Sequence, residues 1–400
     1  MARIVITGIG VNSPVGCSFE EVIRNIQLGT KGLGIIQGSF DAELYPSKFG
    51  AEVKSNGIPF VTTSDVDRKA IFIQESFSEL DKKNNFRNRY KASDIMINIG
   101  AGIDHFDLKE FVNSKDYEND LWQNHCLRAV DVIREIANKY DIQGGHQVNV
   151  SACVASTQAI GNSFRMLQQM PQKAIISGGF DSMLSPLHYM GFYKLGALSN
   201  YNGNAEDACK PFDKNRCGLV IGEGGIAILL EREENAIKSE ILAEICGYSS
   251  TLDAYQLTDP DPNGTFLAEA AKQAIAEAGI SPNDIDCVHL HETGTYKNAM
   301  AEAKAMELIF GERFKEIPVY SMKGQIGHLI GACGAMEFIG IIYSLKYQKV
   351  PVTVNFETTD PEVPLNVIKG KELDFPIKYI LKLNAAFGGQ NTALVIKKYE

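Results

Sequence analysis

Strand-like runs alternate with helix-like runs along nearly the whole 400-residue chain. Residues 3–10, RIVITGIG, are apolar and β-branched, whereas residues 18–29, SFEEVIRNIQLG, carry apolar side chains at helical spacing. Ser18 is a suitable N-cap for that helix and Gly29 a suitable stop. Alternation of this kind predicts an α/β fold with buried parallel or mixed sheets.

An internal similarity suggests that the chain consists of two halves. Residues 147–156, QVNVSACVAS, and 318–336, PVYSMKGQIGHLIGACGAM, both read as a strand, a short turn and a helix rich in small residues. They occupy corresponding places if the chain is cut near residue 245. We therefore expect an N-terminal half at 1–245 and a C-terminal half at 246–400, which meet sheet to sheet or helix to helix.

Composition and charge exclude several classes of protein. The formal net charge of −10 disfavours nucleic-acid binding, because phosphate recognition requires a basic face. No apolar run approaches the roughly 20 residues that span a bilayer, and the N-terminus has no signal-peptide pattern. The eight cysteines form no C-x-x-C pair. We expect a cytoplasmic protein without a structural zinc site, whose most polar segment, 78–93, is a surface loop.

Cys153 stands where an apolar alternating run ends and a helix-compatible sequence begins. Packing alone could explain it, because a free cysteine behaves as a small hydrophobic side chain. The first turn of a helix, however, presents unpaired N–H groups and a positive dipole, which stabilise a thiolate. The second explanation predicts an exposed and acidic thiol.

Two histidines also lie in unusual surroundings. His291 ends a strand in VHLHETGT, and His328 lies between a glycine and a helix of small residues. A single such histidine is commonly a buried ring hydrogen-bonded to the backbone. His289 and His291 could form a metal-binding H-x-H pair, but no third ligand is nearby in the sequence, so we expect His289 to pack and no metal to bind. The glycine-rich strings do not match a dinucleotide fingerprint, so no cofactor is expected.

Several motifs in order along the chain resemble those of one family. RIVITGIGVNSPVG, VSACVAS, PFDKNRCGLVIGEGG, DAYQLTDPDPNG, HETGT, SMKGQIGHLIGACGAMEF and AAFGGQN follow one another at suitable separations. Together they resemble an elongating, type II β-ketoacyl-acyl carrier protein synthase of the thiolase-fold superfamily. The resemblance implies two similar βαβαβαββ-type halves that form a layered α-β-α-β-α core.

The resemblance also implies roles for individual residues. Cys153 matches the nucleophile that accepts an acyl chain, and His291 and His328 match the pair that serves decarboxylation of the malonyl extender. Two neutral imidazoles that donate hydrogen bonds would stabilise the resulting enolate. Lys323 matches the family's lysine, and Glu337 matches its acidic residue one helix further along. We expect these two side chains to pair and to hold the loop of His328 in shape.

Further residues are implied at the gate and at the surface. Phe387 matches a gating phenylalanine whose backbone N–H, with that of Cys153, forms the oxyanion hole, and Gly388 permits its loop to move. Arg68 and Lys69, in VDRKAIFIQESF, resemble the basic residues that meet an acidic acyl carrier protein. Arg128 and Arg134 are additional candidates for this contact. The resemblance further implies a homodimer, or a heterodimer with a chain-length-factor paralogue.

This sequence departs from the family pattern at a few positions. Glu292 replaces a glycine beside His291, and we expect its side chain to point away from the site. Ala385, Ala386, Leu219 and Val154 also differ from the usual residues, which predicts a remodelled acyl pocket and a stiffer gate. Fatty-acid synthesis and type II polyketide or polyene synthesis therefore both remain open.

The set of Cys153, His291 and His328 distinguishes condensation from two other functions. A non-catalytic chain-length subunit would lose the cysteine, whereas this chain keeps Cys153, His291 and His328. Thiolases and initiating synthases that use coenzyme A combine a cysteine with one histidine and a further cysteine or asparagine. The Cys-His-His set therefore favours the condensing enzyme, acting on malonyl and acyl thioesters of a carrier protein.

Overall fold

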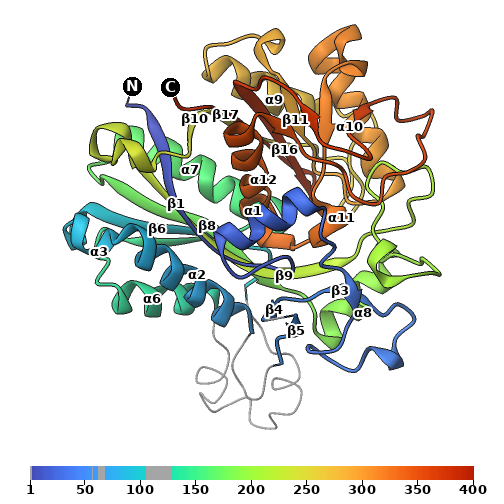
Figure 1. Ribbon diagram of the computed structural model, residues 1–400, viewed down its shortest axis with the longest axis horizontal. Helices are drawn as coiled ribbons and strands as arrows, with labels where there is room; N and C mark the ends of the chain where they lie inside the picture. Colours follow the sequence, from blue (N-terminus) through green and yellow to red (C-terminus); the bar gives the residue numbers. More distant parts are fainter. Residues whose placement is uncertain (1, 56, 62–67, 105–127) are drawn as a thin grey trace.

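The computed structural model describes residues 2–55, 57–61, 68–104 and 128–400 (Figure 1). Its centre is a large mixed sheet in the order β14-β12-β11-β16-β17-β10-β1-β9-β8-β6-β7. The strands on this path are β1 (Ile4–Asn12), β6 (Ile95–Ala101), β7 (His146–Val150), β8 (Ala174–Ser182), β9 (Ile221–Arg232), β10 (Ala243–Leu252), β11 (Cys287–His289), β12 (Pro318–Tyr320), β14 (Asn366–Val367), β16 (Tyr379–Ala386) and β17 (Gln390–Lys397). Short pairs at the periphery are β2 (Gly34–Ile35), β3 (Phe49–Ala51), β4 (Lys54–Ser55), β5 (Ile58–Pro59), β13 (Lys349–Val350) and β15 (Leu373–Asp374).

The sheet confirms two similar halves. Read outward from β1, the first half runs β1-β9-β8-β6-β7, and read outward from β10 the second runs β10-β17-β16-β11-β12. If the short terminal strand β14 is left out, both orders place the first, fifth, fourth, second and third path strand of the half side by side. The halves join where β1 and β10 pair antiparallel, with Ile4 opposite Ile245. Because β10 begins at Ala243, a cut at 245 falls inside this strand.

Helices complete the five layers that the sequence predicted (Figure 1). α2 and α6 cover the outer face of the first half, and α9 and α10 cover the outer face of the second. α7 lies between the two halves and contacts β6 and β8 on one side and β10 and β17 on the other. The helices are α1 (Phe19–Leu28), α2 (Arg68–Asn84), α3 (Phe86–Arg89), α6 (Ala129–Lys139), α7 (Ala155–Gln169), α8 (Pro186–Lys194), α9 (Thr265–Glu277), α10 (Tyr296–Phe310), α11 (Lys323–Ile326) and α12 (Cys333–Tyr347).

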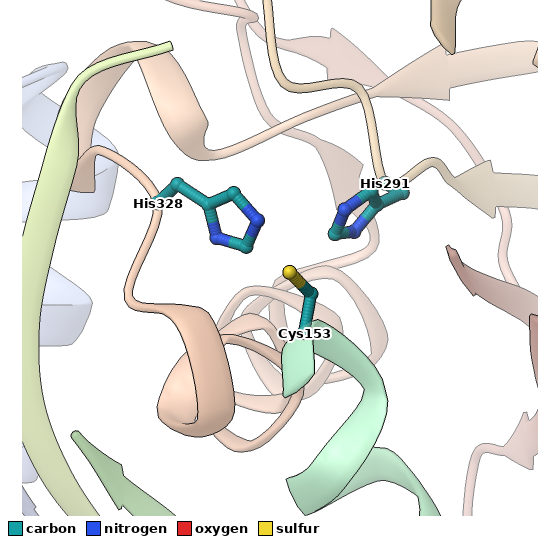
Figure 2. A group of neighbouring side chains, drawn as sticks. All are labelled: Cys153, His291 and His328. Carbon is teal, nitrogen blue, oxygen red and sulfur yellow. The ribbon is translucent and has the colours of Figure 1, made fainter. Parts of the chain in front are cut away.

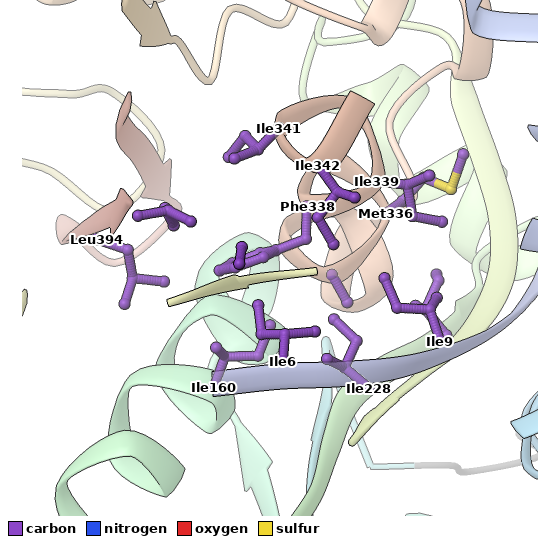
Figure 3. Close-up of a cluster of buried hydrophobic side chains, with 14 of the residues drawn as sticks. Ile6, Ile9, Ile160, Ile228, Met336, Phe338, Ile339, Ile341, Ile342 and Leu394 are labelled. Atoms are coloured by element: carbon purple, nitrogen blue, oxygen red, sulfur yellow. The ribbon is translucent and has the colours of Figure 1, made fainter. Parts of the chain in front are cut away.

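α12 is the centre of the hydrophobic core. All of its residues from 333 to 345 are buried, which suits a helix that is apolar around nearly its whole circumference. Phe338 and Ile342 lie beside Ile6 and Ile228 of the central strands (Figure 3). α7 and α12 approach closely at Gly334, where an added Cβ would lie 2.0 Å from the hydroxyl of Thr157. α7 and α12 are thereby fixed against each other near their first turns.

The local expectations are confirmed at some segments and wrong at one. α1 has Ser18 as N-cap, which accepts from Glu21 N, and Gly29 as a left-handed C-cap. The surface loop predicted at 78–93 is wrong, because α2 continues to Asn84 and α3 follows at once. Between its polar residues this segment carries two fully buried apolar side chains, Leu80 and Phe86. Among the described residues, no helix combines the length and the hydropathy needed to cross a bilayer.

The central position of α12 predicts a large effect of truncation there. Phe338→Ala should lower the free energy of unfolding by about 3–5 kcal/mol, because it leaves a cavity that surrounding helices cannot fill. Leu44→Ala is the control, since Leu44 is 81% exposed, and it should change stability by less than about 0.5 kcal/mol. Urea unfolding measures both, and similar losses for the two variants would contradict this account of the core.

Candidate active site

Cys153 is held on a strained turn between β7 and α7. The turn is the short 3-10 segment η3 (Ala152–Val154), and Ala152 adopts a left-handed conformation with φ of 50°. Ile330 adopts the same conformation, φ 48°, at the corresponding position three residues before α12. Asp181 of β8 accepts from the backbone N–H groups of Gly102 and Gly331, at 2.9 Å each, and so connects the loops that surround the thiol. A non-glycine residue keeps such a backbone only where its surroundings enforce it.

Two histidines reach the thiol from the other half of the fold. His291 follows β11, and His328 follows α11, where its N–H donates to the carbonyl of Val220 at 2.7 Å. The sulfur of Cys153 and a nitrogen of each ring all lie within 4.8 Å of one another. Figure 2 shows both rings directed toward the sulfur. The ring centroids are 5.1 Å apart and the rings nearly perpendicular, at 80°.

These three residues line a pocket of about 280 Å³. The pocket is also lined by Phe387, Thr293 and Tyr296. All three of its reactive side chains are buried. The pocket therefore gives a ligand access to a largely dehydrated set of one thiol and two imidazoles.

Both imidazoles are neutral, and in each ring Nδ1 is the nitrogen that accepts a hydrogen bond from the protein. Nδ1 of His328 accepts from the N–H of Ile330 at 3.1 Å, and Nδ1 of His291 faces Nδ2 of Asn384 at 3.0 Å. Burial, followed by the charge of Lys323, lowers the pKa of His328 to about 3 and holds that of His291 well below its usual value. Each ring therefore carries its proton on Nε2, as a hydrogen-bond donor.

Lys323 and Glu337 form a buried ion pair, with 2.5 Å between Nζ and Oε1. Nζ of Lys323 also donates to the carbonyl of His291 and lies 3.3 Å from its Nδ1. The expected pairing is thus present. The carbonyl of Lys323 accepts from Gly327 beside His328, and its ammonium group contacts His291 as well. Burial would raise the pKa of Glu337, yet the ammonium groups of Lys323 and Lys382 hold it well below its usual range.

The expectation of an acidic thiol at rest is wrong. Burial raises the pKa of Cys153 to about 12, while Lys323 and the backbone N–H groups of Phe387 and Cys153 act in the opposite direction. α7 itself starts only at Ala155, two residues beyond the sulfur, so the helix end does not dominate. Cys153 is therefore a protonated thiol beside two N–H groups that could stabilise negative charge once it forms.

Comparison with known proteins places this geometry in a family. The model of the beta-ketoacyl synthase N-terminal domain matches residues 1–236, and that of the beta-ketoacyl synthase C-terminal domain matches residues 242–357. The chain belongs to the beta-ketoacyl synthase family. It is 32% identical over 417 residues to 3-oxoacyl-acyl-carrier-protein synthase 2 of Synechocystis sp., covering 100% of this chain and 98% of that protein.

Solved structures of beta-ketoacyl synthases share the whole fold. One is a ketosynthase of a type II polyketide system, bound to the hexaketide and in complex with its acyl-carrier protein, with a TM-score of 0.89, 25% identity and full coverage of both chains. Another is a ketosynthase of Xenorhabdus doucetiae in complex with its chain length factor. It has a TM-score of 0.81 and 25% identity, and the match covers 100% of this chain and 98% of that one. These matches confirm the thiolase-like architecture expected from the motifs.

In this beta-ketoacyl synthase, Phe387 occupies the turn between β16 and β17. Its ring lies 6.3 Å from that of Phe192, at 29°, and both rings line the pocket. Gly388 has φ of +83° and donates to the carbonyl of Leu257 at 2.7 Å, so a residue with Cβ would be strained there. Of the unusual residues, Leu219, Ala385 and Ala386 line the pocket, whereas Val154 is buried and does not.

The prediction that Arg68 and Lys69 meet a carrier protein is wrong for this fold. Arg68 is 7% exposed and Lys69 is 3% exposed, at the buried start of α2. The guanidinium of Arg68 donates to Glu223 at 2.5 Å, so its charge is neutralised inside the protein. Arg128 and Arg134 are exposed, and both pair with Asp131 on α6.

Glu292 points away from the catalytic pocket, as expected, but it joins a second buried carboxylate. Its Oε1 accepts from the N–H groups of Phe212 and Gly294, at 3.0 and 3.3 Å. Glu302 of α10 accepts from the N–H groups of His291 and Glu292, at 2.6 and 2.8 Å. Glu302 thereby fixes the backbone that carries His291.

Sequence reasoning did not identify four residues that support the site. They are Asp181, Glu302, Lys382 and Asn384, and all are buried. Lys382 and Asn384 did leave a signal, because both are polar residues in the apolar strand YILKLNAA. His289 packs its ring edge-on against Tyr320 at 4.8 Å, and within the described residues it does not join His291 in any cluster of metal-ligand spacing.

The paired carboxylates predict a pH-dependent stability. Burial, and then the charge of Glu292, raise the pKa of Glu302 to about 8. The folded state therefore retains a proton that the unfolded state has lost, so this contribution to stability is fully present below the unfolded pKa of 4.5 and is lost as the pH rises through about 8. Glu292→Gln removes the neighbouring charge, lowers the pKa of Glu302 and should make this loss smaller.

Urea unfolding of both proteins at about pH 6 and about pH 9 measures the effect. The free energy of unfolding should fall less between the two values in Glu292→Gln than in the parent. An identical fall in both proteins would show that the charge of Glu292 does not raise the pKa of Glu302.

Proposed function

We propose that this chain catalyses acyl transfer from an acyl carrier protein to Cys153 and then decarboxylative Claisen condensation with malonyl carrier. The single observation that carries this proposal is the convergence of one thiol and two N–H-donating imidazoles in one buried pocket. Membership of the beta-ketoacyl synthase family supports the same reaction class.

In the first half-reaction the sulfur of Cys153 attacks the carbonyl carbon of the acyl thioester. The C–S bond to the carrier breaks, and the proton of Cys153 passes to the departing carrier thiol. Negative charge develops on the carbonyl oxygen, and the backbone N–H groups of Cys153 and Phe387 both lower the pKa of the sulfur, so they face this region. Donors fixed in advance at such a position are effective because they need no reorganisation during the reaction.

In the second half-reaction the malonyl carboxylate leaves as carbon dioxide, and its electron pair forms a thioester enolate. Nε2–H of His291 and Nε2–H of His328 donate to the enolate oxygen. The enolate carbon then attacks the acyl carbonyl on Cys153, the C–S bond breaks, and the thiolate of Cys153 takes up a proton. The low pKa values of both imidazoles leave them neutral, which suits donors that must not lose or gain a proton.

We propose an acyl carrier protein as the macromolecular partner that delivers both thioesters. Lys297 lines the pocket and is 66% exposed on its side chain, so it presents a cation at the entrance to the site. It pairs with Asp259, also a pocket residue, at 2.5 Å. Acidic groups of a carrier could replace this carboxylate. The similar type II polyketide ketosynthase is solved in complex with its acyl-carrier protein.

We also propose that β7 is the surface of dimerisation. Among the strands that the structure describes, β7 forms one edge of the large sheet, and Val150 is 51% exposed at its end, immediately before the nucleophile turn. An unpaired edge strand is a template for pairing with another chain. A second copy or a chain-length-factor paralogue fits this edge, and the similar ketosynthase of Xenorhabdus doucetiae is solved with such a factor.

We propose the cytoplasm as the location of the protein. The seven cysteines that the structure describes are all free thiols, the state that the reducing cytoplasm maintains.

Intact-protein mass spectrometry tests the nucleophile. After incubation with a panel of acyl carriers, the parent should retain one acyl group, whose mass defines the chain length accepted. Cys153→Ala should retain none and should abolish formation of the β-ketoacyl product. Cys217→Ala is the control, because that thiol lies outside the pocket, and it should load normally. Product formation by Cys153→Ala would remove Cys153 from the mechanism.

The two histidines should be needed mainly for the second half-reaction. His291→Ala or His328→Ala should lower the rate of carbon dioxide release from malonyl carrier by about 10²–10³, the usual effect of losing one such donor. Loading of Cys153 should change much less. Equal losses in both half-reactions would contradict the enolate-donor role assigned to the imidazoles.

A further inference from the structure

Lys382 places a second buried ammonium group behind the catalytic pocket. It lies in the middle of β16 and is fully buried. Its Nζ donates to Oε2 of Glu337 at 2.7 Å, to Oδ1 of Asn384 and, at 3.5 Å, to the hydroxyl of Thr157. An ammonium group has three donors and no acceptor, so these three oxygens match it completely.

This contact determines which way Asn384 faces. Oδ1 of Asn384 accepts from Lys382 and, at 2.7 Å, from the hydroxyl of Thr157. Its Nδ2 consequently faces Oε2 of Glu337 at 2.8 Å and Nδ1 of His291 at 3.0 Å. If the amide were reversed, its NH₂ group would oppose the ammonium group and its oxygen would oppose a carboxylate. The reversed orientation is therefore strongly disfavoured.

The orientation of Asn384 in turn selects the tautomer of His291. A ring nitrogen that accepts from Asn384 carries no proton, so the proton of the neutral ring lies on Nε2. That nitrogen is the one left to face Cys153 and a bound thioester. Nζ of Lys323, 3.3 Å from the same Nδ1, favours the same tautomer, and the ammonium group of Lys382 strengthens the choice because it fixes Oδ1 of Asn384.

We propose that Lys382 is a positioning residue that, through Asn384, holds His291 as the neutral Nε2–H tautomer. The inference rests on the proposed condensation, because it explains how His291 supplies its donor. The groups that face His291 are Lys323 of α11, Glu337 of α12, Glu302 of α10, Cys153 of η3 and His328, together with Lys382. Lys323 and Lys382 give two positive charges against the one of Glu337, and this excess opposes formation of an imidazolium.

Lys382→Met is the direct test. It should fold, because Lys323 still neutralises Glu337 and methionine replaces the buried side chain with one of similar volume. Condensation should fall about 10–100-fold, by analogy with the loss of an outer hydrogen-bond partner of a metal-binding histidine. Acyl loading of Cys153 should stay within about twofold, since no loading group is touched. The acid limb of the rate profile should move to higher pH, because removal of a positive charge raises the pKa of His291.

Asn384→Leu should give the same split between condensation and loading, through loss of the link itself. Lys397→Met is the matched control, because Lys397 lies on the neighbouring strand β17, 4.0 Å from Glu244 and outside the pocket, and it should leave both half-reactions unchanged. Unaltered condensation and an unaltered pH profile in folded Lys382→Met would overturn the proposal.

Nitrogen-15 spectra of histidine-labelled protein give a readout that does not need activity. His291→Ala assigns the signals of His291. The parent should show the Nε2–H tautomer, and Lys382→Met should show a mixture of tautomers or imidazolium. A parent spectrum with the proton on Nδ1 would overturn the proposal even if Lys382→Met failed to fold. If the parent enzyme neither loads Cys153 nor condenses, it is the proposed function that fails, and the spectra still decide the role of Lys382.

Discussion

The carboxylate of Glu337 is the charge on which the active site depends. It lies fully buried in α12, where an isolated ion would be very unfavourable, and it is bonded by the ammonium groups of Lys323 and Lys382. These three groups come from α11, α12 and β16, and β16 is distant in sequence from the two helices. Asn384 and the thiol of Cys333 also donate to this carboxylate. The network fixes the position of His291 from behind and carries a net positive charge, and its charged residues do not line the pocket.

One consequence is that the reacting groups themselves are uncharged. Burial raises the pKa of Cys153 and lowers those of His291 and His328, so the resting site holds a thiol and two neutral imidazoles. Permanent charge lies in the network behind them and in the Lys297–Asp259 pair of the pocket lining, not on the reacting groups. Such a site favours charge only where it develops during reaction, on the thioester oxygen and the enolate, and this distinguishes the transition state from the bound substrate.

The sequence predicted the architecture well because periodicity reports burial directly. Alternating strands and helices predicted the α/β class and the internal similarity predicted two halves, whereas the five-layer order was implied by the family resemblance. The strained turns at Ala152 and Ile330 repeat the similarity at the site. Local patterns failed where tertiary contacts decide the outcome. Arg68 and Lys69 resemble a solvated helix face, but packing of α2 against the sheet buries them. The expected thiolate at Cys153 came from the helix end alone, whereas desolvation of the sulfur is the larger effect.

The supporting residues were harder to find, since their roles arise only when strands and helices meet. Lys382 was visible as a lysine in an apolar strand, but its partners lie on α7 and α12, at Thr157 and Glu337. Glu302 is one of two acids on α10, and only the fold shows that it accepts from the backbone N–H of His291. By contrast, Cys153, His291 and His328 could be predicted from the sequence, because each lies in a short motif that resembles one of the family.

The ionisation of Cys153 tests the central claim most directly. Ultraviolet absorbance of the thiolate, followed against pH as the difference between the parent and Cys153→Ala, isolates this sulfur from the other cysteines. The account predicts no thiolate signal from Cys153 at neutral pH, with absorbance appearing only in strongly alkaline solution. A full thiolate signal at neutral pH would contradict a site built from uncharged reacting groups.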